Sequence, residues 1–184
     1  MTHFVLQPVL TGTQITLLPL QADDFDALFQ AASDPLIWQQ HPEPTRYQRD
    51  VFARFFDSGM QSGSAFKVVD NQSGVIIGSS RYYDINLPER ELAIGYSFLA
   101  RSHWGGAVNG EMKQLMLQHA FLHVDKVWLH IGANNLRSRR AVEKIGGVFS
   151  HQVEAINAAG ETEYKAHYYL TPAFYQAAMS AAVE

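Results

Sequence analysis

The sequence predicts a mixed α/β fold: a largely antiparallel sheet with one parallel βαβ crossover near its middle. Short β-rich runs alternate with amphipathic helical runs in the order β-α-α-β-β-β-α-β-α-β-β. Short turns join most strand candidates, which is typical of antiparallel pairing, whereas one long helix separates two apolar strand candidates. The 184 residues, 47% of them hydrophobic, can form a core of their own, and no repeat or linker divides them. We therefore expect one domain, residues 1–184.

The first half of the chain predicts three strands and two helices. Residues 14–20 (QITLLPL) read as a strand, and Ala22-Asp23-Asp24 supplies the acidic first turn of a helix. A second helix is expected over 47–60, where apolar side chains recur on one side. The β-rich runs 65–70 and 75–83 flank Asn71-Gln72-Ser73-Gly74, which predicts a hairpin.

The second half contains the predicted crossover. Residues 92–99 (LAIGYSFL) read as a central strand, and a helix is expected after Gly106. The buried face of that helix is predicted from apolar residues at three- and four-residue steps: Val108, Met112, Leu115, Met116, Ala120 and Leu122. The remaining predictions are a strand at 127–131, a helix at 138–145, strands at 148–156 and 163–170 around a turn at 157–160, and a helix led by Pro172.

Composition excludes several classes of protein. Without cysteine there is no disulfide, thiolate metal site, iron–sulfur cluster or cysteine nucleophile. The net charge of −4 argues against a nucleic-acid partner. No signal peptide is visible, and no apolar run approaches the ~18 residues of a membrane helix. We expect a cytoplasmic protein without a membrane partner.

The stretch Trp104-Gly105-Gly106-Ala107-Val108-Asn109-Gly110 carries the most chemistry. Glycines that lead into a helix N-terminus offer unpaired N–H groups to a phosphate or pyrophosphate, although a tight turn without a ligand has the same appearance. A nucleotide-hydrolase P-loop is excluded because no Lys follows a Gly. Gly105-x-Ala107-x-x-Gly110 approximates a dinucleotide-binding turn, but Ala133 and Asn134 stand where its ribose-binding acid belongs.

These motifs resemble the GNAT superfamily of acyl-CoA-dependent N-acetyltransferases, in particular its Rim-type branch of ribosomal-protein N-terminal acetyltransferases. The resemblance rests on Ile94-Gly95-Tyr96, on Trp104-Gly105-x-Ala107 leading to Asn109 and Glu111, and on Asn135-Leu-Arg-Ser138 closing in Glu143-Lys144-Ile145-Gly146. It implies the GNAT fold with a splayed central pair of strands. It also implies transfer of acetyl from acetyl-CoA, as co-substrate without a metal, to a primary amine in a ternary complex.

The resemblance also implies which residues hold acetyl-CoA. Backbone groups of Phe98, Leu99 and Ala100 would pair with the pantetheine arm, and N–H groups from Gly105 to Asn109 (Gly105, Gly106, Ala107, Val108, Asn109) would cradle the pyrophosphate. Asn135 and Ser138 would face the pantetheine and the sulfur, and Arg139 would reach a phosphate.

The usual acid and base of the family are missing. Val142 stands where many members have a tyrosine that protonates the leaving thiolate, and Ala93 stands where relatives often have a glutamate. Ser102 replaces a common Gln or Arg. Ser138 is the candidate hydroxyl near the sulfur, with helix capping as its other reading, and Glu91 is the candidate base. Further base candidates are Asp84, His103 and Tyr82.

Two other functions remain open at this point: a catalytically weak acyl-CoA-binding module and a nucleotide-dependent oxidoreductase. His119 and His123 have a zinc-ligand spacing, but no third ligand is evident. The acceptor is expected to be a peptide N-terminus or a small-molecule amine, and the protein a monomer or homodimer.

The charge is divided unevenly along the chain. Residues 101–144 hold seven Lys/Arg against three Asp/Glu, or +4, so the rest of the chain carries −8. This division predicts a polyanionic cofactor on the basic segment and a cationic acceptor on the acidic remainder.

Overall fold

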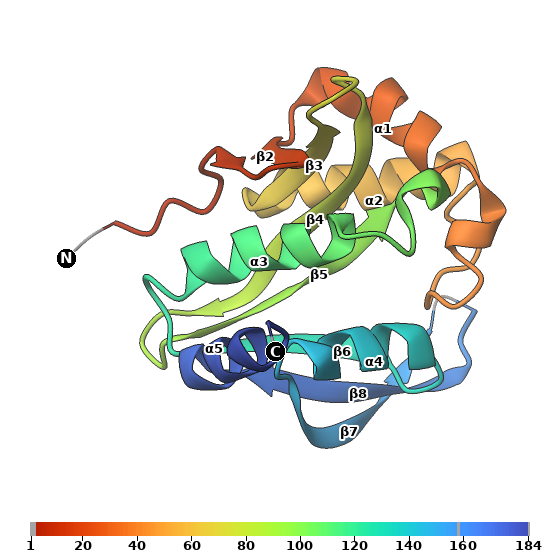
Figure 1. Ribbon diagram of the computed structural model, residues 1–184. Helices are drawn as coiled ribbons and strands as arrows, with labels where there is room; N and C mark the ends of the chain where they lie inside the picture. Colours follow the sequence, from red (N-terminus) through yellow and green to blue (C-terminus); the bar gives the residue numbers. More distant parts are fainter. Residues whose placement is uncertain (1–2, 158, 184) are drawn as a thin grey trace.

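The computed structural model describes residues 3–157 and 159–183, which form an eight-stranded sheet with helices on both faces (Figure 1). The strand order is β1-β2-β3-β4-β5-β6-β8-β7. Only β5 and β6 pair in parallel; the other neighbours are antiparallel. The predicted mixed α/β architecture with one parallel crossover is confirmed.

The strands are β1 (Leu10–Thr11), β2 (Ile15–Pro19), β3 (Ala65–Asp70), β4 (Ile76–Asn86), β5 (Glu91–Leu99), β6 (Lys126–Gly132), β7 (Val148–Ile156) and β8 (Thr162–Leu170). The helices are α1 (Phe25–Ala32), α2 (Arg49–Ser62), α3 (Val108–Ala120), α4 (Leu136–Lys144) and α5 (Pro172–Ala181). Three 3-10 turns, η1 (Ala22–Asp24), η2 (Pro35–Ile37) and η3 (Arg101–His103), complete the elements.

Most predicted elements match the observed ones, and the differences have local causes. Strand β1 and the 3-10 turns are too short to leave a periodic pattern. Helix α3 ends at Ala120, where the chain turns through Leu122 N–H to His119 O (3.2 Å) and Val124 N–H to Ala120 O (2.9 Å). Leu122, which was predicted on the buried face, is therefore 73% exposed, and Val124 is buried in its place.

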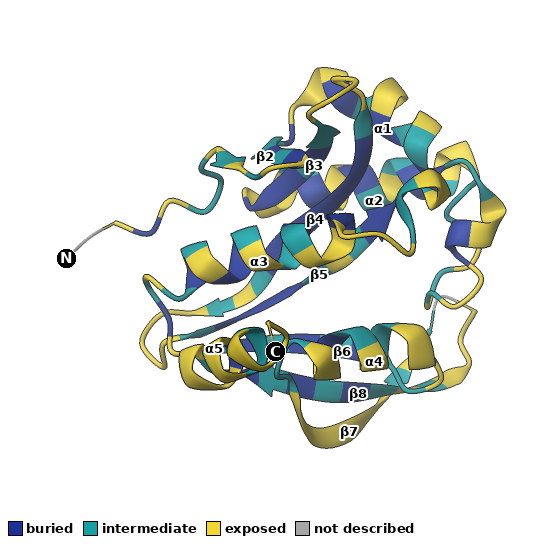
Figure 2. Cartoon of the chain, in the orientation of Figure 1, coloured by how far each residue is buried: buried dark blue, intermediate teal, exposed yellow. Residues whose placement is uncertain are grey.

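Each face of the sheet has its own core. Helix α3 buries Met112 and Met116 against one face, and α1 and α2 bury their apolar sides, including Phe52 and Phe56, against the other. Helices α4 and α5 lie on the same side as α3, as Figure 1 shows, and Figure 2 shows the buried inner sides of these elements. Each large side chain buried in this way contributes about 1.5–3 kcal/mol. We call these two faces the α3 face and the α2 face.

Strands β5 and β6 part after a short paired stretch. Pairing is confined to Glu91–Lys126, Leu92–Val127 and Ala93–Trp128, so β5 runs on from Ile94 to Leu99 without β6 beside it. Tyr96 has φ +52°, and the β4–β5 register shifts between Ser79 and Arg81, which marks a β-bulge. A bulge bends its strand. The predicted splay of the central strands is therefore present, with the bulge inside the splayed stretch.

Candidate functional site

The glycine turn lies where the splayed strand β5 ends. The chain passes from Leu99 through η3 to Trp104, whose Nε1–H donates to Leu99 O (2.9 Å). Gly105 has φ +74°, a conformation that favours glycine, and α3 begins three residues later. A Cβ at Gly105, Gly106 or Gly110 would meet no heavy atom within 4 Å, so the space in front of the turn is open.

The N–H groups of this turn have no hydrogen-bond partner among residues 3–157 and 159–183. In the described part of the chain, no backbone or side-chain acceptor faces the N–H groups of residues 105–110, and the N-cap Ala107 provides none. The first paired N–H is that of Glu111, which donates to Ala107 O (2.9 Å). Open space and free N–H groups at the positive end of a helix make an anion site. The residues Gly105 to Asn109 thus have the geometry expected of a phosphate cradle.

The end of β5 offers one backbone edge to the gap between β5 and β6. Ala100 N–H donates to Ile77 O beside β4 (2.7 Å), and its carbonyl accepts from His103 N–H (2.9 Å). Because backbone groups alternate along a strand, Leu99 faces away from β4 and Phe98 faces β4. Of the three predicted pantetheine contacts, only Leu99 N–H therefore points into the gap; the polar groups of Phe98 and Ala100 are directed to their neighbours.

The start of α4 lies across from the glycine turn. Asn135 is buried and caps the helix, its Oδ1 accepting Ser138 N–H (3.2 Å). Ser138 is half-buried in the first turn. The guanidinium of Arg137 lies over the Trp104 ring, 4.0 Å from its centroid, and so joins α4 to the glycine turn. Sequence reasoning missed Arg137, because only the tertiary contact distinguishes it from its basic neighbours.

Two predicted residues are not brought to this site. Arg139 donates from Nε to Tyr168 Oη and from Nη1 to Ala133 O, both at 2.9 Å, so its guanidinium ties α4 to β8 rather than pointing to the glycine turn. Glu91 begins β5 and accepts Trp128 Nε1–H (3.0 Å) at the paired end of the strands. Eight residues of strand, roughly 26 Å, separate it from Leu99. The base and the phosphate ligand that we propose below are therefore residues other than Glu91 and Arg139.

The other base candidates also have local roles. Tyr82 is fully buried in the core and donates its hydroxyl to Met116 O (2.7 Å). His103 lies 3.9 Å from the Asp70 carboxylate, and Asp84 sits in a second β-bulge with φ +47°. Glu111, part of the family motif, accepts N–H groups of Thr13, Gln14 and Ile15 at 2.7–3.0 Å and so fastens the β1–β2 turn to α3.

A histidine that the sequence analysis did not single out lies on the α2 face beside the splayed stretch. Tyr83 on β4 and His130 on β6 are hydrogen-bonded, with 2.9 Å between Oη and Nδ1. Burial lowers the pKa of His130 below its ordinary 6.5; the charge of Asp84 opposes this shift, and those of Lys165 and His151 add to it, so the lowered pKa favours the neutral ring at pH 7. His130 also stacks on His167, with ring centroids 3.8 Å apart. A pattern within a single sequence could not indicate that Tyr83 and His130, 47 positions apart, form a hydrogen bond.

A lysine with an altered pKa lies on the α3 face of the same bulge. Lys113 Nζ donates to Ser97 Oγ (2.9 Å), which in turn lies 2.7 Å from Ser80 Oγ. Burial of the ammonium lowers the pKa of Lys113 to about 8. Among the described residues no carboxylate comes within 4 Å of it. The bulge thus has a neutral histidine near one face and a readily titrated lysine on the other.

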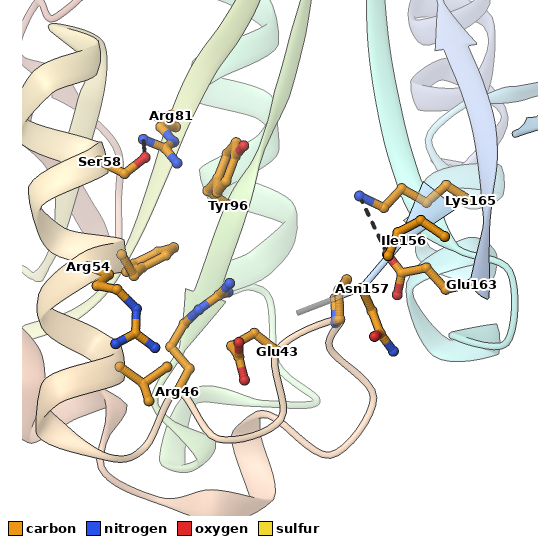
Figure 3. A pocket seen from close by; sticks show the side chains of 13 residues that line it. Glu43, Arg46, Arg54, Ser58, Arg81, Tyr96, Ile156, Asn157, Glu163 and Lys165 are labelled. Atoms are coloured by element: carbon orange, nitrogen blue, oxygen red, sulfur yellow. Dashed lines mark hydrogen bonds and ion pairs between the residues drawn. The ribbon is translucent and has the colours of Figure 1, made fainter. Parts of the chain in front are cut away.

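A pocket of about 330 Å³ opens on the α2 face (Figure 3). Helix α2 and the loop before it form one wall, the β7–β8 hairpin forms the other, and Tyr96 of the bulge lies between them. Its charged lining residues are Arg46, Arg54, Arg81, Lys165, Glu43 and Glu163. Cations outnumber acids here, so the prediction of a cationic acceptor is not supported: the acidic charge of the remaining chain is not gathered at this pocket.

The two histidines with zinc-ligand spacing have other contacts. His119 Nε2 lies 2.8 Å from Val5 O, and His123 stacks on Phe4 with ring centroids 4.4 Å apart. In residues 3–157 and 159–183 no three His, Cys, Asp or Glu side chains gather as metal ligands. Within the same ranges, each helix is too short or too polar to cross a membrane.

Comparison with known proteins agrees with this geometry. Residues 14–148 match the family model described as "Acetyltransferase (GNAT) domain". A GCN5-related N-acetyltransferase from Brucella melitensis superposes with a TM-score of 0.84 at 23% identity, covering 95% of this chain and 85% of the other. Mycobacterium smegmatis RimJ, solved with CoA-disulfide, gives a TM-score of 0.72 at 16% identity, covering 95% and 91%. No curated protein sequence matches the chain.

Proposed function

This chain belongs to the GNAT acetyltransferase family, and from that premise we propose that it transfers acetyl from acetyl-CoA to a primary amine. The observation that supports the proposal best is the open glycine turn, with its unpaired N–H groups, at the end of a strand that has parted from its parallel neighbour. The acceptor we propose is the α-amine of a peptide or a small-molecule amine.

The cofactor fits the residues present. The N–H groups from Gly105 to Asn109 would hold the pyrophosphate, and Leu99 N–H would pair with the pantetheine arm. Arg137, already over Trp104 at the turn, adds a cation at the same end of the gap. Asn135 and Ser138 at the start of α4 border the gap from the other side.

Acetyl-CoA supplies the acetyl group as a thioester; the reaction forms an N–C bond, breaks the C–S bond and requires one proton to leave the amine and one to reach the thiolate. His130 is the base we propose, because its ring is neutral at pH 7 and Tyr83 fixes its orientation through Nδ1. Its Nε2 is then the atom that accepts the proton.

Two groups on the α3 face can provide the proton that the leaving thiolate of CoA requires. Lys113 has a pKa of about 8, close to the ~8.5 of a free thiol, and lies at the bulge. Ser138, the candidate from sequence, has a half-buried side chain at the start of α4. Both groups are polar and close to the splayed strands, and neither is a carboxylate.

The acceptor amine itself limits what the base must do. An α-amine with a pKa near 8 is about a tenth neutral at pH 7, whereas a lysine amine near 10.4 is almost wholly charged. A site whose base is a single histidine therefore suits α-amines. The likeness to RimJ in fold and the Rim-type motifs support a peptide N-terminus as the acceptor class.

A CoA-release assay over peptides, amino-acid amines and polyamines tests the proposal. We expect release of CoA that depends on the amine, with α-amines faster than lysine ε-amines at neutral pH. Binding of acetyl-CoA without turnover on any amine would favour the non-catalytic acyl-CoA-binding module. Thermal stabilisation by NAD(P) and not by CoA would favour the oxidoreductase.

A further inference from the structure

We propose that the acceptor amine carries a carboxylate, which Arg46, Arg54 and Arg81 bind in the pocket on the α2 face. This inference rests on the proposed acetyl transfer and adds the class of acceptor. The pocket is the space beside the bulge on the face away from α3, whose N-terminus forms the glycine turn. An acceptor placed there would approach the gap between β5 and β6 from the side that the cofactor cradle does not occupy.

Arg81 is the strongest evidence for an anion. It lines the pocket from β4 with only 4% of its surface exposed, and its Nη1 donates to Ser58 Oγ (3.0 Å). Its Nε is buried without any hydrogen-bond partner. Burial of a guanidinium without a carboxylate is costly, although the Tyr96 ring, whose centroid lies 3.4 Å from the Arg81 Cζ, offsets part of that cost. A carboxylate in the pocket would supply the missing countercharge.

Arg46 and Arg54 extend the cationic wall toward solvent. Arg46 lies over the Phe55 ring, 4.6 Å from its centroid, and burial lowers its pKa to about 10. Arg54 is exposed on α2. Among the described residues none of the three arginines has an ion-pair partner within 4 Å. By contrast Arg49, which like Arg54 belongs to α2, pairs with Asp26. Within the described part of the chain, the arginines that line the pocket are therefore left without a carboxylate partner.

The acids in the lining limit the charge of the ligand. Glu163 pairs with Lys165 at 3.7 Å, and Glu43 accepts from the Thr45 hydroxyl (2.5 Å). These two carboxylates, one in each wall of the pocket, repel a dianionic phosphate more strongly than a singly charged carboxylate. Arg81 pairs in register with Gly95, next to the bulge at Tyr96. The carboxylate we propose therefore lies close to the amine, as in a free amino acid or an acidic second residue of a peptide.

The experiment compares acceptors that differ only in this charge. Initial rates of CoA release would be measured for Ala-Asp-Ala amide, Ala-Asn-Ala amide and Ala-Lys-Ala amide, and for free alanine and alanine amide. We expect kcat/KM at least tenfold higher with aspartate than with asparagine, and lowest with lysine. Free alanine and alanine amide distinguish the two possible sources of the carboxylate. A higher rate with free alanine than with its amide assigns the carboxylate to a free amino acid. A preference found only among the Asp peptides assigns it to the side chain of the second residue.

Arg54→Glu tests the wall with little risk to folding, because Arg54 is exposed. We expect it to abolish the preference for Ala-Asp-Ala amide over Ala-Asn-Ala amide, measured as the ratio of their kcat/KM values. Arg49→Glu, on the same helix outside the pocket, is the matched control and should keep the preference. Arg81→Met should raise KM for the Asp peptide, provided that its circular dichroism is unchanged.

The failure of each proposal has its own signature. Equal rates with the Asp and Asn peptides together with equal rates for free alanine and alanine amide, or a preference for the lysine peptide, would overturn the carboxylate proposal and leave acetyl transfer intact. If no amine releases CoA, acetyl transfer fails. Calorimetric binding of acetyl-Ala-Asp-Ala amide, which has no free amine, then decides the pocket: binding that weakens in Arg54→Glu supports it, and absence of binding overturns it.

Discussion

Tyr83 and His130 illustrate how the fold sets the protonation state of single residues. Desolvation lowers the pKa of His130, and its position on the α2 face places it on the same side as the Arg81 pocket. As a base it must be neutral, so kcat at saturating amine should fall as the pH drops below 6.5. We expect an acidic limb in the pH profile of kcat with its midpoint below 6.5.

His130→Gln should remove this limb and reduce kcat about a hundredfold, in the range of a lost general base. His123→Gln is the matched control, since His123 stacks on Phe4 and is not among the groups that shift the pKa of His130. The pH profiles of the three proteins, recorded with a saturating α-amine, provide the measurement. An unchanged acidic limb in His130→Gln would assign the titration to another group.

Asn135 was singled out as a cofactor contact within a motif, and that role stays a prediction. The structure shows that its side chain caps α4, which is a local role. The contacts of Arg139 with Tyr168 and of Glu91 with Trp128 could not be predicted, because the direction of a side chain and the end of a strand pair depend on tertiary contacts. His130, Arg137 and Arg81 were missed for the same reason: each gains its role from a partner more than 20 residues away.

At the scale of elements, the glycine turn and α3 form one unit whose function can be separated from its folding. A side chain at Gly106 meets open space, and its φ is not in the left-handed region. Gly106→Asp would place a carboxylate before the free N–H groups and repel phosphate. We expect KM for acetyl-CoA to rise at least tenfold, with the melting temperature within about 2 °C of wild type.

Gly106→Asn is the control, because it has nearly the same shape and no charge. Its KM for acetyl-CoA should lie well below that of Gly106→Asp. The difference between the two KM values should become smaller at high ionic strength, because salt screens the repulsion between the carboxylate and the phosphates. Equal KM values for Asp, Asn and wild type would show that phosphates do not bind at this turn.

The elements themselves could largely be predicted from periodicity and turn chemistry. The hairpin over Asn71–Gly74 closes with Asp70 N–H to Val75 O (3.0 Å) and Gly74 at φ +71°, as its turn residues indicate. The bulge at Tyr96 could not be predicted, because a non-glycine residue at φ +52° depends on the register between β4 and β5. That bulge positions Arg81, Tyr96 and Ser97, and with them much of the candidate site.

At the scale of the whole molecule, the net charge of a sequence segment predicts the charge of the glycine turn but not that of the acceptor pocket. The +4 of residues 101–144 agrees with an anion site at the glycine turn, and Arg137 is the member of that set observed there. The −8 of the remainder predicted a cationic acceptor, yet three arginines of that remainder meet at the pocket. Folding brings scattered residues together regardless of the charge of their segments.

Histidines couple the stability of the molecule to pH. Desolvation lowers the pKa of His41 and of His167 to about 4, and that of His130 below 6.5. The unfolded chain therefore binds more protons than the folded one between pH 6.5 and 4, so stability must fall as pH falls through this window. The melting temperature should decline as the pH falls below 6.5, and decline less steeply in His41→Gln. A melting temperature that rises on acidification would contradict these pKa directions.

The central claim is that this chain moves an acetyl group from CoA to an amine. Mass spectrometry with isotope-labelled acetyl-CoA and Ala-Asp-Ala amide measures this directly. We predict one labelled acetyl group on the peptide α-amine for each CoA released, with release that stops when the peptide is omitted. Labelled acetate without labelled peptide, or no CoA release although acetyl-CoA binds, would contradict the account.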